Sequence, residues 1–171
     1  MNKTVRKAVI AGNWKMNQTP AEAKELITAI APLVKDAGCD VVACVPYVDI
    51  ATAIEAAKGT NIKIGAENCH WAVSGAFTGE ISPAMLREAG CTWVLTGHSE
   101  RRHVLGESPD FVGKKTAFAL EQGFSVILCI GETLAERKAG KLNSILWLQL
   151  ERGLAGLGPN AVSYTHLTLP T

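Results

Sequence analysis

The sequence predicts an α/β fold in which parallel β-strands alternate with α-helices. Short, almost wholly apolar runs recur along the chain, and such runs are typical of strands covered on both faces. A segment with apolar residues at helical spacing follows each run, and glycine and proline separate the segments. Five strand–helix units lie between Met1 and about Gly158, and this repeat predicts a parallel sheet with helices packed on it.

The predicted elements follow in order along the chain. The strands are expected at residues 8–11, 41–45, 62–64, 93–95 and 126–130. The first helix has a capping box at Thr19–Glu22 with proline at its first position, and apolar residues recur at helical spacing until Gly38. The other helices are expected at residues 50–57, from Ser82 to Gly90, from Ser108 to near Gly123, and at about residues 142–154.

Composition limits the class of protein. A chain of 171 residues with 47% hydrophobic residues is expected to form one globular domain. The net charge is +1 and basic residues are interspersed with acidic ones, so we expect neither nucleic acid nor a membrane surface as a partner. The first 15 residues hold an apolar run of four, too short for a signal peptide, and predict a cytoplasmic protein.

The cysteines do not predict a metal site. Their number is odd, and they lack the close paired spacing of zinc ligands. Most lie in or beside apolar runs, where a free thiol behaves as a small hydrophobic side chain. We therefore expect reduced, mainly buried thiols at Cys39, Cys44, Cys69, Cys91 and Cys129.

Polar residues at the strand ends distinguish between two architectures, the doubly wound sheet and the eight-fold barrel. They are Asn13 and Lys15 after the first strand, Glu67 and Asn68 after the third, His98 and Glu100 after the fourth, and Gly131 and Glu132 after the fifth. Barrel enzymes place their active sites at this end of the strands. No glycine-rich fingerprint follows the first strand, where a dinucleotide-binding fold requires one. The pattern favours a (β/α)8 barrel.

Taken singly, these residues also have ordinary structural interpretations. Lys15 could hold an anionic substrate, but most lysines in such a place are simply solvated. His98 stands where a short helix could begin, and the N–H groups there would favour a neutral imidazole that donates to a carbonyl oxygen. A structural histidine fits equally well. The long segment 65–82 carries Trp71 and Phe77, and we expect it to dock into a partner subunit rather than to cradle phosphate.

Four motifs in one colinear order carry a family resemblance. They are Ala-Gly-Asn-Trp-Lys-Met-Asn at 11–17, Gly-Ala-Glu-Asn at 65–68 with Gly-Ala-Phe-Thr-Gly-Glu-Ile-Ser at 75–82, Gly-His-Ser-Glu-Arg-Arg at 97–102, and Cys-Ile-Gly-Glu-Thr at 129–133. In these motifs the chain resembles triosephosphate isomerase. The resemblance covers about residues 5 to 158.

The resemblance implies a cytosolic homodimer with a (β/α)8 TIM-barrel fold that acts in glycolysis and gluconeogenesis. Such an enzyme interconverts dihydroxyacetone phosphate and glyceraldehyde 3-phosphate by proton transfer through an enediolate, without metal or organic cofactor. By resemblance, Asn13 and Lys15 bind the substrate, His98 polarises its carbonyl group, and Glu100 supports Lys15. Thr78 lies on the loop 65–82, which in the family packs against Asn13 and Lys15 of the partner subunit.

The chain departs from the family pattern near its end. The family's general base is a glutamate in a Tyr-Glu-Pro-Val-Trp context, whereas Thr165 follows Tyr164 here, and a threonine hydroxyl cannot abstract a carbon-bound proton at neutral pH. We also expect His166 to be incidental. The sequence thus predicts no general base and an isomerase that is C-terminally truncated after about residue 160.

The expected fold is therefore an incomplete barrel. Residues 1–158 would form a partial TIM barrel of five βα units, and residues 159–171 a tail outside the family pattern that offers a possible sixth strand. Without the base, the lid and the phosphate-binding turns, turnover would be severely impaired. Unpaired strand edges would also favour self-association beyond the dimer. The alternative is a non-catalytic, self-associating barrel fragment or a cloning product.

Overall fold

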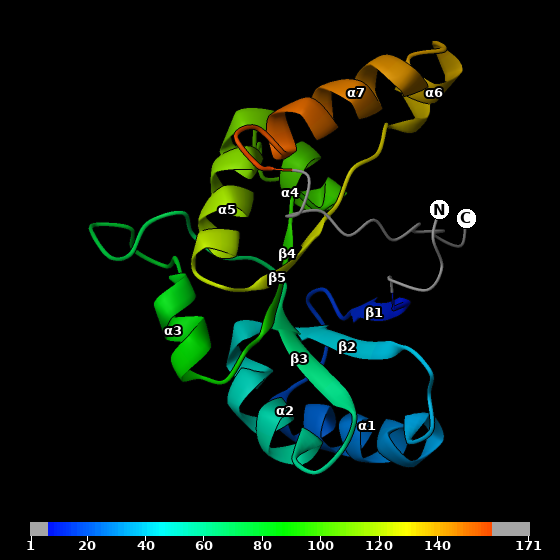
Figure 1. Cartoon of the computed structure of the whole chain (residues 1–171), viewed down its shortest axis with the longest axis vertical. Helices are drawn as coiled ribbons and strands as arrows, with labels where there is room; N and C mark the ends of the chain where they lie inside the picture. Colours follow the sequence, from blue (N-terminus) through cyan, green and yellow to red (C-terminus); the bar gives the residue numbers. More distant parts are fainter. Residues whose placement is uncertain (1–6, 159–171) are drawn as a thin grey trace.

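The computed structural model describes residues 7–158, in which five parallel strands form one sheet. The strands pair in sequence order, so that every strand lies beside its predecessor. The sheet curls into a half-barrel with the helices along its outer side, as Figure 1 shows. This arrangement confirms the predicted incomplete (β/α)8 barrel. The strands are β1 (Val9–Asn13), β2 (Asp40–Val45), β3 (Ile62–Ala66), β4 (Trp93–Thr96) and β5 (Ser125–Leu128).

Seven α-helices and two 3₁₀ turns connect the strands within residues 7–158. They are α1 (Pro20–Ile30), α2 (Ile50–Ala57), α3 (Pro83–Glu88), α4 (Ser99–His103), α5 (Pro109–Glu121), α6 (Leu134–Lys138) and α7 (Leu142–Gly153), with η1 (Ala31–Val34) and η2 (Tyr47–Asp49). The predicted capping box is present, because the Thr19 N–H and hydroxyl both donate to Glu22 Oε2. Ser82 and Ser108 cap α3 and α5 in the predicted places.

Several boundaries differ from the prediction, and one helix was not predicted. The first helix was expected to reach Gly38 but ends at Ile30 and tightens into η1, because Pro32 has no N–H and its ring crowds the preceding turn. The fifth strand was expected to reach residue 130 but ends at Leu128. Helix α6 was not predicted, although Thr133 and Glu136 form a capping box that the sequence displays.

The two faces of the sheet carry separate apolar clusters. On the outer face Val45, Ile64 and Val94 pack against Ile27, Ala53, Leu86 and Ala119 of the helices. On the concave face the cluster consists of Val42, Cys44 and Leu95, with Val9, Ala11, Trp93, Ile127 and Cys129 packed against it. Because successive side chains of a strand point to opposite faces, this division fixes which residues line the barrel interior. The same alternation directs Asn13 inward at the end of β1.

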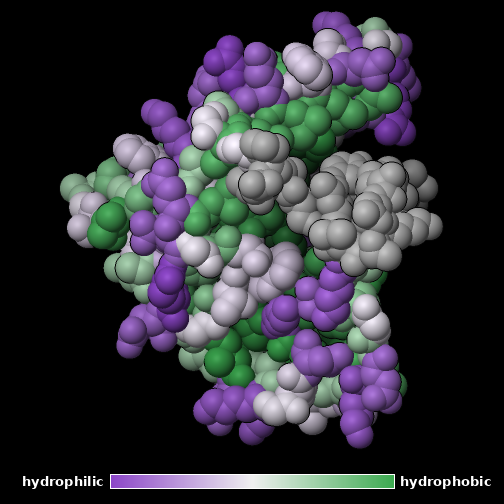
Figure 2. Space-filling view, in the orientation of Figure 1, coloured by the Kyte–Doolittle hydropathy of each residue, from purple (hydrophilic) through white to green (hydrophobic). Residues whose placement is uncertain are grey.

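The surface of the described residues is mixed. Figure 2 shows apolar surface along α7, where Trp147 is 72% exposed, between charged side chains. None of the described helices has the length and hydropathy of a membrane span. All five cysteines are free thiols, and Cys44, Cys69 and Cys91 are buried, as expected from the sequence. Burial raises the pKa of the Cys69 thiol to about 11, so this thiol stays protonated at neutral pH.

Candidate active site

The end of β1 places Asn13 and Lys15 at the mouth of the half-barrel. The Trp14 N–H donates to the Cys44 carbonyl at 3.0 Å, which extends the pairing with β2 beyond Asn13. The Lys15 N–H then donates to Asn13 Oδ1 at 3.1 Å, and Lys15 adopts a φ of 56°. Few residues other than glycine occupy this left-handed region, and an asparagine side chain bonded to the turn helps to hold it. Strained backbone of this kind is typical of functional sites.

Lys15 and Glu100 bring the ends of two strands together. Lys15 Nζ lies 2.8 Å from Glu100 Oε1, although the residues follow β1 and β4, which are not neighbours in the sheet. The hydrogen bond from Lys15 lowers the pKa of Glu100. Both side chains are about half exposed, so water screens the pair and its contribution to stability is small. Its effect is to fix where the ammonium group lies.

His98 occupies the N-cap position of α4. Its Nδ1 accepts a hydrogen bond from the Glu100 backbone N–H at 3.3 Å, and this acceptor role leaves the proton of a neutral ring on Nε2. Glu100 Oε2 approaches the same Nδ1 at 3.4 Å and favours the charged ring. Burial outweighs this attraction and lowers the pKa of His98, with a further decrease from the Lys15 charge. At neutral pH the ring is therefore an uncharged donor through Nε2.

Two further carboxyl groups, which follow β3 and β2, have buried oxygens without hydrogen-bond partners. Glu67 follows β3, and its Oε1 is buried with no partner among residues 7–158. Burial raises the pKa of Glu67 to about 7 and outweighs a hydrogen bond from the Lys15 backbone, which lowers this pKa, and the charges of Asp49 and Glu100 add to the increase. Asp49 is fully buried, and both its oxygens lack partners in the described chain. Burial raises the pKa of Asp49 as well. No sequence pattern indicated Asp49, which lies in a turn between two apolar residues.

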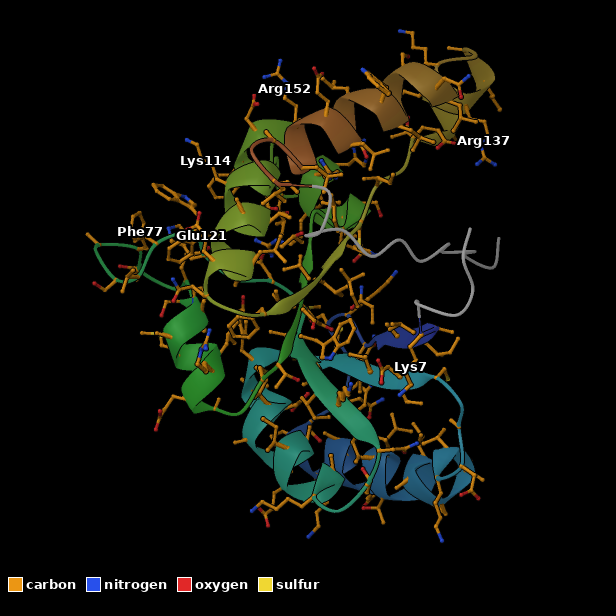
Figure 3. The ribbon with its side chains drawn as sticks, viewed as in Figure 1. Lys7, Phe77, Lys114, Glu121, Arg137 and Arg152 are labelled. Carbon is orange, nitrogen blue, oxygen red and sulfur yellow. The ribbon has the colours of Figure 1, made fainter. Side chains whose placement is uncertain are left out.

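Thr78 is not brought to Asn13 or Lys15 of its own chain. It lies in the segment 67–82 between β3 and α3, which projects from the body of the molecule and carries Phe77, labelled in Figure 3. No hydrogen bond joins Thr78 to Asn13 or Lys15 within residues 7–158. Thr165, which is predicted from the sequence to stand in the place of the family's general base, lies outside the described residues.

The base of the projecting segment is firmly held. Lys115 is fully buried, and its Nζ donates to Asn68 Oδ1 at 2.5 Å and to both oxygens of Glu107 at 2.6 and 2.7 Å. Arg101 Nε also donates to Glu107 at 2.7 Å. His70 packs on Phe77 with ring centroids 4.2 Å apart. These contacts order the root of the segment, while Trp71, Val73 and Phe77 remain exposed.

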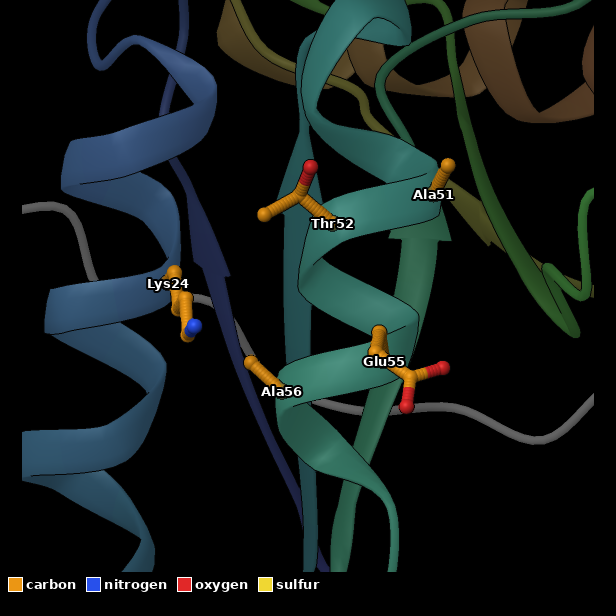
Figure 4. A pocket seen from close by; sticks show the side chains of 5 residues that line it. All are labelled: Lys24, Ala51, Thr52, Glu55 and Ala56. Carbon is orange, nitrogen blue, oxygen red and sulfur yellow. The ribbon is translucent and has the colours of Figure 1, made fainter.

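Other parts of the described chain offer no competing site. A shallow hollow lies between α1 and α2 in the outer helical layer, and Figure 4 shows that short side chains with one lysine and one glutamate line it. Its charged side chains are those of Lys24 and Glu55. Within residues 7–158, no three His, Cys, Asp or Glu side chains gather as ligands for a metal ion. The polar groups converge at the ends of β1, β3 and β4.

Comparison with known proteins agrees with this arrangement. The profile of the family described as triosephosphate isomerase matches residues 8–168. The chain belongs to the triosephosphate isomerase family. A relative named triosephosphate isomerase from Clostridium novyi (strain NT) is 48% identical over 161 residues, which are 94% of this chain and 64% of the relative. The relative of that name from Moorella thermoacetica is 46% identical over 153 residues, which are 90% of this chain and 61% of the relative.

The family match covers only part of the length of the triosephosphate isomerase relatives. The chain spans 64% of the length of the first curated relatives that it matches. Within that part, the geometry brings together an ammonium group from Lys15 and a neutral imidazole from His98. An ammonium can counter negative charge on a bound anion, and a neutral imidazole can donate to a carbonyl oxygen as charge develops there.

Proposed function

We propose that this chain carries the substrate-binding and electrophilic half of a triose-phosphate isomerase active site. The observation that carries the proposal is the group at the ends of β1 and β4, in which Lys15 pairs with Glu100 and the neutral ring of His98 caps α4. The substrate class is a triose phosphate, dihydroxyacetone phosphate or glyceraldehyde 3-phosphate. The family supports this assignment, since its curated relatives bear the name of that enzyme.

Each residue has a distinct role in the proposal. Asn13 and Lys15 bind the substrate, and the Lys15 ammonium opposes the negative charge of the phosphate and of the developing oxyanion. His98 donates from Nε2 to the carbonyl oxygen, which acidifies the neighbouring C–H bond and stabilises the enediolate. Glu100 holds the Lys15 ammonium in place. A carboxylate must then remove the proton from carbon.

The polypeptide of residues 1–171, assayed alone, is expected to turn over slowly. Thr165 aligns with the family's general base, and its hydroxyl cannot accept a carbon-bound proton at neutral pH. The loss of a positioned general base typically lowers the rate by a factor of about 10²–10⁴. The absence of phosphate clamps and of a closing lid lowers it further. The alternative, a non-catalytic, self-associating barrel fragment or a cloning product, is not favoured, because the family profile matches residues 8–168.

The proposal includes a homodimer formed through the segment 65–82. Thr78 would then approach Asn13 and Lys15 of the partner subunit and complete the site. The anchored root and exposed tip of this segment suit such docking, since Trp71, Val73 and Phe77 present apolar surface outside the core. We further propose a cytoplasmic location, turnover without metal or organic cofactor, and a boundary near residue 158 between the barrel and the tail.

A binding experiment tests the proposal independently of turnover. The purified chain, checked by intact mass to exclude a contaminating host isomerase, is titrated with dihydroxyacetone phosphate by calorimetry. We expect weak binding that Lys15→Ala abolishes, because that change removes the ammonium group. Lys24→Ala, which removes an exposed lysine from α1, is the matched control and is expected to bind as the wild type does. Equal binding by the wild type and Lys15→Ala would contradict the proposal.

A further inference from the structure

Arg102 is a buried cation that holds main-chain carbonyl groups rather than a carboxylate. It lies in α4 and is 9% exposed. Its Nε donates to the Gly97 carbonyl at 2.7 Å, and its Nη2 donates to the Cys129 carbonyl at 2.9 Å. Nη1 is buried without a partner, and no acidic side chain pairs with the guanidinium in the described part of the chain. Burial accordingly lowers the pKa of Arg102.

Arg102 donates hydrogen bonds to the carbonyl groups of the two peptide groups that flank His98. The Gly97 carbonyl belongs to the peptide group before His98, and the guanidinium holds it. The His98 carbonyl belongs to the following peptide group, and the Arg102 backbone N–H donates to it at 3.1 Å. Together with the bond from the Glu100 N–H to Nδ1, these contacts restrain the His98 main chain and ring. The Arg102 side chain makes the bond to the Gly97 carbonyl, and the Arg102 backbone makes the bond to the His98 carbonyl.

The third contact ties this turn to the neighbouring strand. The last bond between β4 and the chain after β5 is donated by the Cys129 N–H to the Thr96 carbonyl at 2.8 Å. Arg102 extends the pairing between these two segments by one peptide group, because its guanidinium donates to the carbonyls of both Gly97 and Cys129. The space is closely filled, since a Cβ on Gly97 would lie 2.5 Å from Nη2 and 2.6 Å from Val112 Cγ1. A planar guanidinium can make both bonds in a fixed geometry, whereas an ammonium cannot.

The burial of Arg102 without an anionic partner among the described residues costs free energy, so we expect its contacts to determine the local geometry around His98. A desolvated cation without an anionic partner loses hydration free energy that hydrogen bonds to neutral carbonyls recover only in part. We propose that Arg102 is a positioning residue, which sets the orientation of the His98 ring by fixing the Gly97 carbonyl against the end of β5. An effect of Arg102 on catalysis rests on the proposed function, because Arg102 would act on a carbonyl substrate only through His98.

Imidazole NMR of the full chain tests this role without substrate. The His98 signals in protein labelled with ¹⁵N-histidine are identified by their loss in His98→Gln. In the wild type we expect one neutral tautomer, with the proton on Nε2. In Arg102→Met, which keeps a side chain of similar length but no donors, we expect a mixture of tautomers and a protonation midpoint higher by roughly 0.5 pH unit or more. Arg102→Lys keeps the charge but loses the planar guanidinium, and we expect a tautomer mixture between those of the wild type and Arg102→Met.

The matched control is Arg101→Lys, on the same helix. Arg101 bonds to Glu107 and to neither of the two carbonyls, so its replacement is expected to leave the His98 tautomer unchanged. A folded Arg102→Met with the wild-type tautomer and midpoint would overturn the proposal. An equal change of the His98 tautomer in Arg101→Lys would also overturn it, because it would indicate that any change in α4 loosens the packing around His98.

A measurement on the wild type covers the case in which the variants do not fold. The Arg102 Nε proton is expected to exchange with solvent far more slowly than that of Arg137, which is largely exposed. Equal exchange rates would overturn the proposal. These readouts do not depend on the proposed function: a chain that binds no triose phosphate yet loses its single tautomer in Arg102→Met would refute the isomerase site and support the positioning role.

Discussion

Replacement of Glu67 by glutamine is expected to stabilise the fold at alkaline pH. The ionised carboxylate is half-buried, and its Oε1 has no partner within residues 7–158. Folding raises the pKa of this group from 4.5 to about 7. A difference of that size corresponds to about 3.4 kcal/mol of unfavourable ionisation free energy in the folded state well above pH 7. Partial exposure screens the charge, so we expect Glu67→Gln to gain about 1–2 kcal/mol.

The sign of the pH dependence follows from the direction of the pKa shift. The folded pKa exceeds the unfolded one, so the folded chain retains a proton that the unfolded chain releases. The contribution of Glu67 is therefore most favourable below pH 4.5 and is lost as pH rises towards the folded value of about 7. Glutamine has no such dependence. The gain in Glu67→Gln should be absent near pH 4.5, grow through neutral pH, and be complete near pH 8.

Urea unfolding at a series of pH values between 5 and 8 measures this effect. The free energy of unfolding is compared for the wild type, Glu67→Gln and Glu121→Gln, whose carboxylate is exposed on α5 and labelled in Figure 3. Each titration is repeated at two protein concentrations to separate stability from association. The reasoning fails if Glu67→Gln is less stable than the wild type at both pH 5 and pH 8, because the carboxylate would then be ionised and well bonded throughout.

Three further changes have defined outcomes. Lys115→Met removes the cation that binds Glu107 and Asn68, and we expect a loss of about 3–5 kcal/mol in urea unfolding, against a small effect for the exposed neighbour in Lys114→Met. Gly97→Ala places a Cβ within 2.6 Å of two side chains at a φ of 66°, and thermal unfolding should show a marked decrease in midpoint. Thr133→Ala removes the cap of α6 and should cost about 1 kcal/mol in urea unfolding, whereas Thr133→Ser should restore most of it.

Periodicity and caps were enough to predict most of the fold. The strands were recognisable because their two buried faces require apolar residues throughout, and Thr19, Ser82 and Ser108 mark helix starts by direct hydrogen bonding. The end of α1 at Ile30 was less evident, since the apolar spacing continues past Pro32 and the 3₁₀ turn keeps Ala31 and Val34 partly buried against the same apolar cluster as Ile30. Helix α6 was readable in principle from its capping box, but it lacks a buried face.

The candidate site was predictable as a set of residues but not as a geometry. Barrel architecture places the residues after each strand at one rim, which is why Asn13, Lys15 and His98 could be named together. Their contacts depend on features that spacing does not reveal. The bond between Lys15 and Glu100 joins residues 85 positions apart and requires a left-handed backbone at Lys15, where the sequence has no glycine. The unpartnered oxygens of Glu67 and Asp49 arise from burial, which a single sequence does not report.

The pattern of charge around Lys15 connects stability with the proposed function. The Lys15 ammonium group pairs with Glu100, and the Glu67 carboxyl group interacts electrostatically with Glu100, so an ionised Glu67 would add to the negative charge that opposes the approach of a phosphate. Burial raises the pKa of Glu67 to about 7 and so decreases its negative charge near neutral pH, while Glu100 pairs with Lys15 and stays ionised. The local field near neutral pH is thus less negative than the count of acidic residues implies. The Glu67 carboxyl group that costs folding stability at alkaline pH is the same group whose neutral form would favour an anion in the proposed site.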